Sequence, residues 1–116
     1  MGIRPFIGCE NFKTSREFYN KIGFTESIVS YNMSYFSRDG IGFYLQDAYV
    51  KDWVDNSMVF WEVEDVEAVL NELTALDVTK FHSRVRLSEI HYNDWGKEFF
   101  LHDPSGVLWH IGSFNK

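Results

Sequence analysis

The fold of this chain is decided by the segment Phe18-Tyr19-Asn20-Lys21-Ile22-Gly23-Phe24 together with the segment Asp103-Pro104-Ser105-Gly106. The first segment predicts the end of a helix, because an apolar helical face stops there at a glycine. The second predicts a turn that leads into the apolar run 107–111. Each segment has a counterpart in the other half of the sequence, so the chain is expected to contain one small unit twice.

The duplication follows the register of apolar positions. A shift of 54 residues places the predicted strand 4–9 over 58–63, and a shift of 64 residues places 42–46 over 106–110. The difference between the two shifts leaves one insertion between the matched blocks. Because identity between the halves is low, the repeat rests on the hydrophobic pattern alone.

Length and composition bound the class of protein. A chain of 116 residues with 45% hydrophobic content is long enough for one compact domain with a core. We expect a single domain over 1–116, with a first module at about 1–50 and a second at about 57–116.

Charge and cysteine usage indicate the partners and the compartment. The net charge of −6 argues against binding to nucleic acid phosphates and favours a cationic or neutral small ligand. No apolar run is long enough to span a bilayer, and no signal peptide precedes the first predicted strand. The single cysteine, Cys9, fits a reducing compartment and is expected in the core. We therefore expect a cytoplasmic protein with no nucleic acid or membrane partner.

Two helices are predicted from capping signals and periodicity. Thr14 with Glu17 is typical of a capping box, so the first helix is expected to begin at Thr14 and to end at Gly23. The second helix carries an apolar stripe that consists of Val66, Val69, Leu70, Leu73 and Leu76.

Two hairpins are predicted from alternating runs. The runs 34–38 and 41–47 are joined by Asp39-Gly40, a favoured two-residue turn. The runs 97–102 and 107–113 are joined by the turn that contains Pro104. The predicted order is strand, helix and three strands, twice, which is an α+β class.

This layout resembles the vicinal oxygen chelate superfamily, which includes glyoxalase I, extradiol dioxygenases, and fosfomycin and bleomycin resistance proteins. The resemblance covers nearly the whole chain and is carried by Ser15-Arg16-Glu17-Phe18-Tyr19 with Ile22-Gly23-Phe24, by Trp61-Glu62-Val63-Glu64-Asp65-Val66, and by Trp95-Gly96-Lys97-Glu98-Phe99 before Asp103-Pro104-Ser105-Gly106. It implies two βαβββ modules whose curled mixed sheets form half-barrels around a concave site.

Strand alternation assigns the side chains to two faces of each sheet. The face toward the helices, and therefore the core, is expected to hold Ile7, Cys9, Phe43, Leu45, Val59, Trp61, Val63, Phe99, Leu101, Trp109 and Ile111. The concave face is expected to hold Arg4, Phe6, Tyr44, Gln46, Met58, Phe60, Glu62, Glu98, Phe100, Leu108 and His110. The second set is too mixed for a core and too aromatic for an ordinary wet surface.

The resemblance also implies where a metal ion would be bound. Superfamily members that do chemistry hold a divalent ion with four His, Glu or Gln side chains, and the corresponding positions here are Arg4, Gln46, Met58 and His110. Arg4 is a permanent cation and Met58 is a soft thioether, so neither suits such an ion. We expect no metal and no other cofactor, unless Glu62, Glu98 or His102 completes the shell around Gln46 and His110.

Without the ion, the superfamily's device for polarising a substrate oxygen is missing. A general acid and base could be assembled from Glu62, Glu98 and His110, but we interpret these as polar residues that line a wet groove, with the glutamates available to pair with Arg4. His82 and His91 precede Trp95 in an irregular stretch and are expected to be solvated. We therefore assign no catalytic residue.

The local pattern is most similar to the metal-free bleomycin resistance proteins, through Ser57-Met58-Val59-Phe60-Trp61-Glu62-Val63 and Gly96-Lys97-Glu98-Phe99. That resemblance implies that a flat ligand, which can be cationic, is sequestered without chemistry in a groove between two subunits. Trp53 and Trp95 are expected in polar loops, where their rings can stack on a ligand. The expected ligand-binding set is Arg4, Phe6, Tyr44, Gln46, Trp53, Met58, Phe60, Glu62, Trp95, Glu98, Phe100 and His110.

Curled sheets also predict a homodimer, because they leave strand edges and apolar surface that are costly to expose. Each groove is expected to join Arg4, Phe6 and Gln46 of one chain to residues of the other chain. The residues expected from that other chain are Met58, Phe60, Glu62 and His110.

Three function hypotheses remain. The first, which we favour, is a metal-free small-molecule binding protein of the bleomycin-resistance type. The second is a metal-dependent glyoxalase-type lyase or dioxygenase with a rearranged ligand shell. The third is a structural or sensory partner that binds no small ligand.

Overall fold

The structure, a computed structural model, describes residues 1–116 as an alternation of strands and helices. The first half contains β1 (Phe6–Gly8), α1 (Phe12–Lys21), β2 (Thr25–Ser30), β3 (Met33–Arg38) and β4 (Ile41–Gln46). A short helix, α2 (Lys51–Asp55), leads to the second half. That half contains β5 (Met58–Glu62), α3 (Val66–Ala75), the 3₁₀ helix η1 (Val78–Lys80), β6 (Arg86–Leu87), β7 (His91–Asn93), β8 (Gly96–His102) and β9 (Leu108–Phe114).

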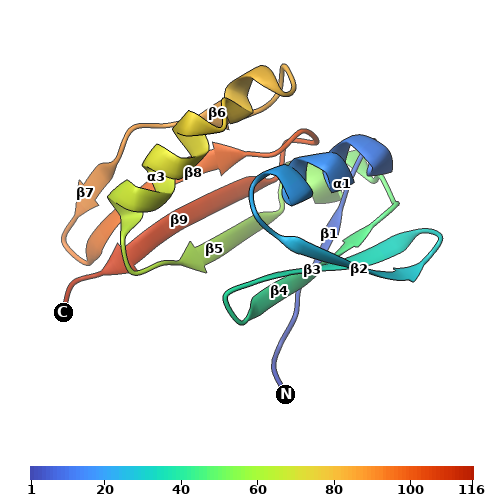
Figure 1. The fold of residues 1–116 in the computed structure, drawn as a ribbon, viewed down its shortest axis with the longest axis horizontal. Helices are drawn as coiled ribbons and strands as arrows, with labels where there is room; N and C mark the ends of the chain where they lie inside the picture. The colour runs from blue at the N-terminus through green and yellow to red at the C-terminus, as the bar shows by residue number, and fades with distance from the viewer.

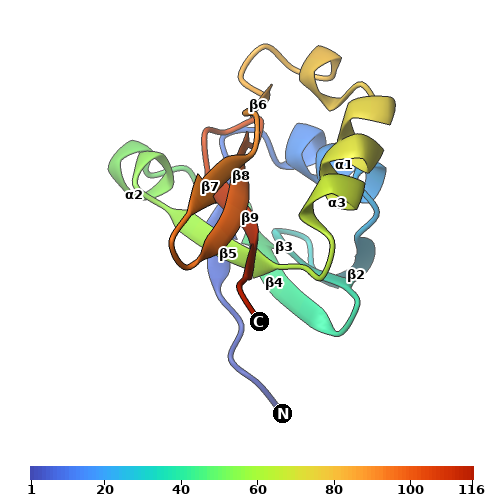
Figure 2. The same ribbon diagram turned by 90° about the vertical axis from the view of Figure 1, so that its left-hand side faces the viewer.

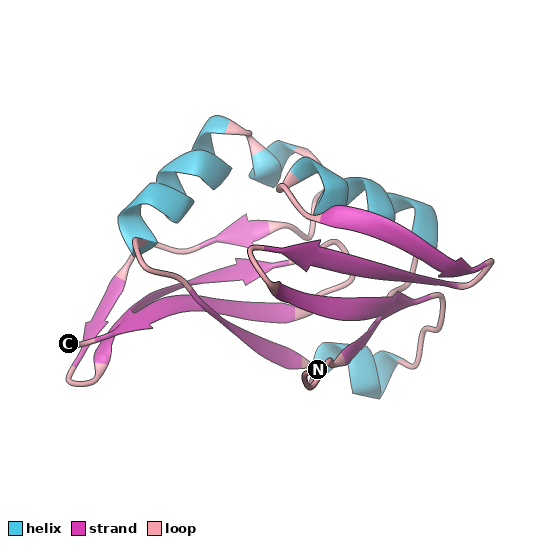
Figure 3. Cartoon of the chain, turned by 60° about the horizontal axis from the view of Figure 1, so that its bottom comes forward, coloured by secondary structure: helices cyan, strands magenta, loops and turns pink.

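The two halves form two mixed sheets of the same design. The first sheet has the order β1-β4-β3-β2 with β1 parallel to β4, and the second has the order β5-β9-β8-β6 with β5 parallel to β9. The strand β7 also pairs with β8, so β6 and β7 together occupy the place that β2 has in the first sheet. The sheets lie next to one another, with α1 and α3 on the same side (Figures 1 and 3). The predicted α+β class with two curled mixed sheets is confirmed.

The helix boundaries are set by side-chain caps. Asn11 caps α1 by accepting a hydrogen bond from the backbone N–H of Thr14 at 3.0 Å, and Asp65 caps α3 in the same way through Ala68. The expected capping box that starts at Thr14 is therefore wrong, because Thr14 already lies in the first turn. The expected end of α1 is confirmed, since Gly23 has the left-handed φ of 98°.

The first hairpin has the predicted turn. Asp39 and Gly40 have φ values of 53° and 83°, the signature of the tight turn that matches the twist of paired strands. The second hairpin also forms, and both strand pairs lie within one residue of the predicted limits. No helix has the length and apolarity needed to cross a bilayer.

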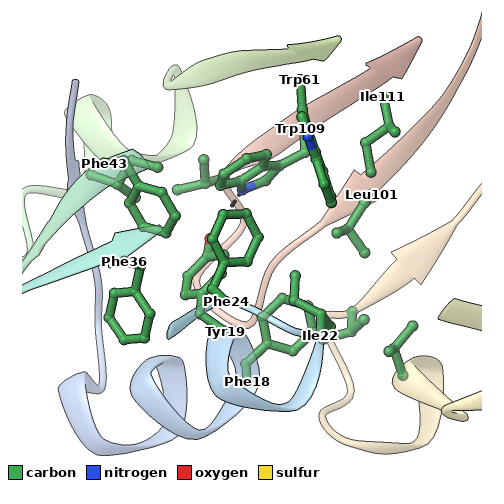
Figure 4. Packing of buried hydrophobic residues seen from close by; sticks show 14 of the residues in the cluster. Phe18, Tyr19, Ile22, Phe24, Phe36, Phe43, Trp61, Leu101, Trp109 and Ile111 are labelled. Atoms are coloured by element: carbon green, nitrogen blue, oxygen red, sulfur yellow. Dashed lines mark hydrogen bonds between the residues drawn. The ribbon is translucent and has the colours of Figure 1, made fainter. Parts of the chain in front are cut away.

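The core is a single cluster of buried side chains between the helices and the sheets. Tyr19 lies at its centre, with ring centroids 4.9 Å from Phe43 and 5.7 Å from Trp109 (Figure 4). The face predicted to be toward the helices is confirmed: all its residues are buried except Val59 and Val63, which are half-buried against the cluster. Cys9 is fully buried, and burial raises the pKa of its thiol to about 12, as expected for a core residue.

A buried hydrogen-bond network joins the two halves. The Tyr19 hydroxyl donates to Asp103 Oδ2 at 2.6 Å and accepts from Trp109 Nε1 at 3.0 Å. Asp103 Oδ1 accepts from the backbone N–H groups of Ser105 and Val107, both at 2.9 Å. Helix α1 of the first half is therefore bonded to the β8–β9 turn of the second half. Every buried side-chain nitrogen and oxygen in the structure has a hydrogen-bond partner.

Replacing Tyr19 by Phe should destabilise the protein by about 1–3 kcal/mol, because Asp103 loses a donor and Trp109 loses its acceptor inside the core. Urea denaturation followed by circular dichroism measures the change. The matched control is Tyr31→Phe, since Tyr31 is 92% exposed and should lose almost nothing. Equal stability of the two variants would contradict the role of the network.

The buried carboxyl of Asp103 should also give a distinctive pH dependence. Burial raises the pKa of Asp103, although hydrogen bonds from Tyr19, Val107 and Ser105 oppose the shift. The folded state therefore holds this proton more readily than the unfolded state, so the contribution to stability is largest in acid and falls as the pH rises above the ordinary value near 3.8.

The measurement is the unfolding free energy of the wild type minus that of Asp103→Asn, taken as a function of pH from acid to neutral. This difference cancels the titration of the other carboxyl groups and should decrease as the pH rises. A difference that grows with pH would contradict a raised pKa.

Candidate functional site

The side of the sheets turned away from α1 and α3 is here called the open face, and the short helix α2 is the only helix on that side (Figure 2). By strand alternation it carries the residues expected on the concave face. Phe6, Met58 and Phe60 on this face are 52%, 66% and 43% exposed. These are high values for apolar side chains, so the open face is apolar surface without a cover in the single chain.

In the first sheet the open face carries a cationic side chain set among aromatic rings. Arg4 Nη1 donates to the Tyr44 hydroxyl at 3.2 Å, and the guanidinium lies 4.4 Å from the centre of the Tyr35 ring. The hydrogen bond to Tyr44 raises the pKa of Arg4 further. Phe6 stacks on Tyr44 with ring centroids 5.1 Å apart. Arg4, Phe6 and Tyr44 are thus brought together as predicted.

Gln46 and Tyr35 are the other residues of the first sheet close to this group. Gln46 lies beyond this group, half-buried, with Gly8 and Met33 as its register partners. Tyr35 was missed by sequence reasoning. The predicted hairpin contained the necessary signal, because the two-residue turn at Asp39 and Gly40 fixes Tyr35 directly opposite Tyr44.

In the second sheet the open face carries a histidine paired with a buried carboxyl group. His110 Nδ1 lies 2.7 Å from Glu98 Oε1, and Asn93 Nδ2 donates to Glu98 Oε2 at 3.5 Å. Glu98 was expected to line a wet groove or to pair with Arg4. The structure instead buries it to 9% exposure against His110. Glu98 lies opposite Gly112 in the ladder, and the missing side chain there leaves room for this contact.

Beside this pair lies a cluster of exposed rings, here called the aromatic platform: Phe60, Trp95 and Phe114. The Trp95 ring lies 6.0 Å from Phe60 and 5.3 Å from Phe114, and the three side chains are 37% to 53% exposed. Trp95 is in the predicted loop, the tight turn between β7 and β8. Phe114 was missed because the expected strand ended at Ser113, although alternation from His110 places Phe114 on the same face.

Trp53 was expected in a loop, but the structure places it in helix α2. A Cβ atom built on Gly8 would lie 2.4 Å from the Trp53 ring, so the ring rests on the bare backbone of β1. The salt bridge between Lys51 and Asp55, at 2.6 Å, spans one turn and supports this short helix. With 36% exposure, Trp53 is partly available at the edge of the open face.

The other expected site residues lie at the margins. Glu62 is exposed at the end of β5 and borders a separate cavity of about 500 Å³ between the β3–β4 turn and α3. Phe100 is half-buried, with its edge toward His110 at 5.0 Å between ring centroids. Met58 is exposed and lies opposite Leu108 in the ladder.

The remaining histidines differ partly from the expectation. His91 is exposed on β7 as predicted, although its ring also lies 5.2 Å from Phe100. His82 is half-buried rather than solvated, and its Nδ1 accepts a hydrogen bond from the backbone N–H of Arg84.

The residues at the four metal positions implied by the resemblance do not fit a divalent ion. Arg4 is engaged with Tyr44 and brings a permanent positive charge, while Met58 offers only an exposed thioether. Glu98 is turned to His110, and His102 lies at the far end of β8 opposite Arg86. No group of three or more His, Cys, Asp or Glu side chains lies close enough together to hold an ion.

Comparisons with known proteins agree with this architecture. The sequence matches no protein-family model, and no curated protein matches it. Among solved structures, a bleomycin resistance determinant encoded on the transposon Tn5 superposes with a TM-score of 0.86 and 14% identity, over 100% of this chain and 99% of that one.

Two further solved structures are similar. The bleomycin-binding protein of the bleomycin producer Streptomyces verticillus, in complex with copper(II)-bleomycin, gives a TM-score of 0.81 and 17% identity over 99% of this chain and 97% of that one. Lactoylglutathione lyase from Agrobacterium tumefaciens gives a TM-score of 0.74 and 13% identity over 97% of this chain and 92% of that one. These likenesses confirm the predicted resemblance: the chain has the fold of the vicinal oxygen chelate superfamily, in the form found in bleomycin-binding proteins.

Proposed function

We infer that this protein binds a flat small molecule on its open face and sequesters it without chemistry. The observation that carries the proposal is the aromatic platform, which holds Phe60, Trp95 and Phe114 in contact but leaves each ring partly exposed. Stacking on exposed rings is the ordinary way in which proteins bind flat ligands. The full-length similarity to bleomycin-binding proteins supports the same function.

The chemistry of the site favours binding over catalysis by the superfamily's mechanism. Arg4 and Met58 stand where the resemblance places metal ligands, and no third His, Cys, Asp or Glu side chain joins the His110–Glu98 pair. Arg4 is instead held over Tyr35 and bonded to Tyr44, an arrangement suited to contact with a ligand.

The proposal includes a homodimer. Large apolar side chains such as Phe6, Met58 and Phe60 lie exposed on one face of one chain, which is costly in water. A second copy related by a two-fold axis would cover them by setting the first sheet of one chain against the second sheet of the other. Each groove would then contain Arg4, Phe6 and Gln46 of one chain and Met58, Phe60, Glu62 and His110 of the other.

Bleomycin should bind to the protein in a saturable manner, with one ligand for each chain. Isothermal calorimetry and the quenching of tryptophan fluorescence measure the affinity and the stoichiometry. Trp95→Ala should weaken binding about tenfold or more, since one stacking face is lost, which corresponds to about 1.4 kcal/mol. The matched control is Tyr31→Ala, an exposed aromatic residue in the turn between β2 and β3.

Two outcomes would contradict this function. One is a lack of binding at millimolar bleomycin. The other is conversion of the hemithioacetal of methylglyoxal and glutathione by protein supplied with nickel. That result would support the alternative hypothesis of a metal-dependent lyase.

In solution the protein should have twice the chain mass of 13.7 kDa at micromolar concentration, as measured by light scattering after gel filtration. Phe6→Glu should shift it to the monomer, because the charge would be buried in the interface. Tyr31→Glu carries the same charge off the open face and should remain dimeric. A wild-type monomer at tens of micromolar would contradict the proposed arrangement.

A further inference from the structure

Glu98 is a buried carboxyl group that has no lysine or arginine partner. Its side chain contacts His110 Nδ1 at 2.7 Å and Asn93 Nδ2 at 3.5 Å, and no lysine or arginine lies within 4.0 Å. The neighbouring Lys97 is engaged with Glu67, at 2.6 Å. A buried carboxylate is costly unless positive charge or hydrogen bonds compensate it. Glu98 has only His110 and Asn93 to provide this compensation.

The ring of His110 is held in one orientation. Phe60 stacks parallel to it, at 17° and 6.3 Å between centroids, and Phe100 meets it edge-on at 85° and 5.0 Å. With Nδ1 directed to Glu98, the other nitrogen, Nε2, has no partner in the protein. Because every buried side-chain nitrogen has a partner, Nε2 is open to solvent on the open face.

The carboxylate determines what Nε2 can bind. A histidine whose Nδ1 faces a carboxylate keeps its proton on Nδ1, which leaves Nε2 as a hydrogen-bond acceptor. In that form the His110–Glu98 pair carries one net negative charge. The imidazole is the member of the pair that reaches the open face, so a ligand meets this charge through Nε2. A cation that donates an N–H to Nε2 gains both the hydrogen bond and the charge attraction.

We propose that the His110–Glu98 pair is the receptor for a cationic N–H group of the ligand, an amidinium, a guanidinium or a protonated amine. The flat part of the same ligand then stacks on the aromatic platform, whose Phe60 is in contact with His110. This inference rests on the proposed function and names the chemical class of its ligand. The other titratable group that faces Glu98 is His91 of β7, its partner in the ladder.

The test uses two probes of the same shape, benzamidine and its neutral analogue benzamide. Titrations are followed by nitrogen-15 NMR of the His110 side chain and of the Trp95 indole at pH 7.5. The proton between His110 and Glu98 should be found on Nδ1, and Nε2 should be the acceptor nitrogen. Benzamidine should shift both signals and bind at least tenfold more tightly than benzamide.

Glu98→Gln should reduce the affinity for benzamidine to that for benzamide, and it should move the His110 proton between the nitrogens. Glu89→Gln is the matched control, since Glu89 is exposed in the loop between β6 and β7 and the charge change is identical. The comparison of the two probes on the unmodified protein stands even if Glu98→Gln fails to fold.

A doubly protonated His110, a proton on Nε2, or equal affinities for the two probes would overturn the inference. If one of these outcomes is observed but bleomycin binds tightly, the inference fails and the proposed function stands. Discrimination between the probes without any bleomycin binding would instead uphold the receptor and refute that function.

Discussion

The hydrogen bond from the Tyr19 hydroxyl to Asp103 is the constraint on which the rest of the structure depends. It fastens the helix of the first half to the β8–β9 turn of the second, and the same hydroxyl holds the indole of Trp109. Trp109 is fixed toward the core, so His110, the next residue along the strand, must point to the open face. A buried interaction between the halves thus determines where His110, a candidate site residue, lies on the opposite side of the sheet.

The turn also sets the register of β8 and β9. Asp103 ties the backbone N–H groups of Ser105 and Val107, and the strands then pair so that Glu98 lies opposite Gly112. Gly112 leaves space that Glu98 and the Phe60 ring share. The His110–Glu98 pair and the aromatic platform are therefore products of the same turn, which connects the duplicated fold to the chemistry of its open face.

The fold was predictable because its signals are local and repeated. Alternation placed residues such as Phe43 and Trp109 in the core, and Gly23 and Asp39-Gly40 marked the turns correctly. The start of α1 was misplaced because Thr14 and Asn11 are both acceptable N-cap residues. The extended backbone conformation of Asn11, which the sequence does not show, makes Asn11 the cap. Helix α2 was missed because five residues carry too little periodicity to be recognised.

The candidate site was predictable only in part. Patterning identified Arg4, Phe6 and Tyr44 as one face, but the partner of Glu98 depends on strand register and on an absent side chain at Gly112, which composition does not reveal. Trp53 rests on Gly8, a contact between residues far apart in sequence.

Our central proposal is that this fold holds a small molecule here and does not transform it. A crystal structure of the protein with bleomycin tests this most directly. The account predicts ligand density between the aromatic platform of one protomer and Arg4 and Phe6 of its partner. Ligand density elsewhere, or an ion coordinated by His110 and other protein side chains alone, would contradict it.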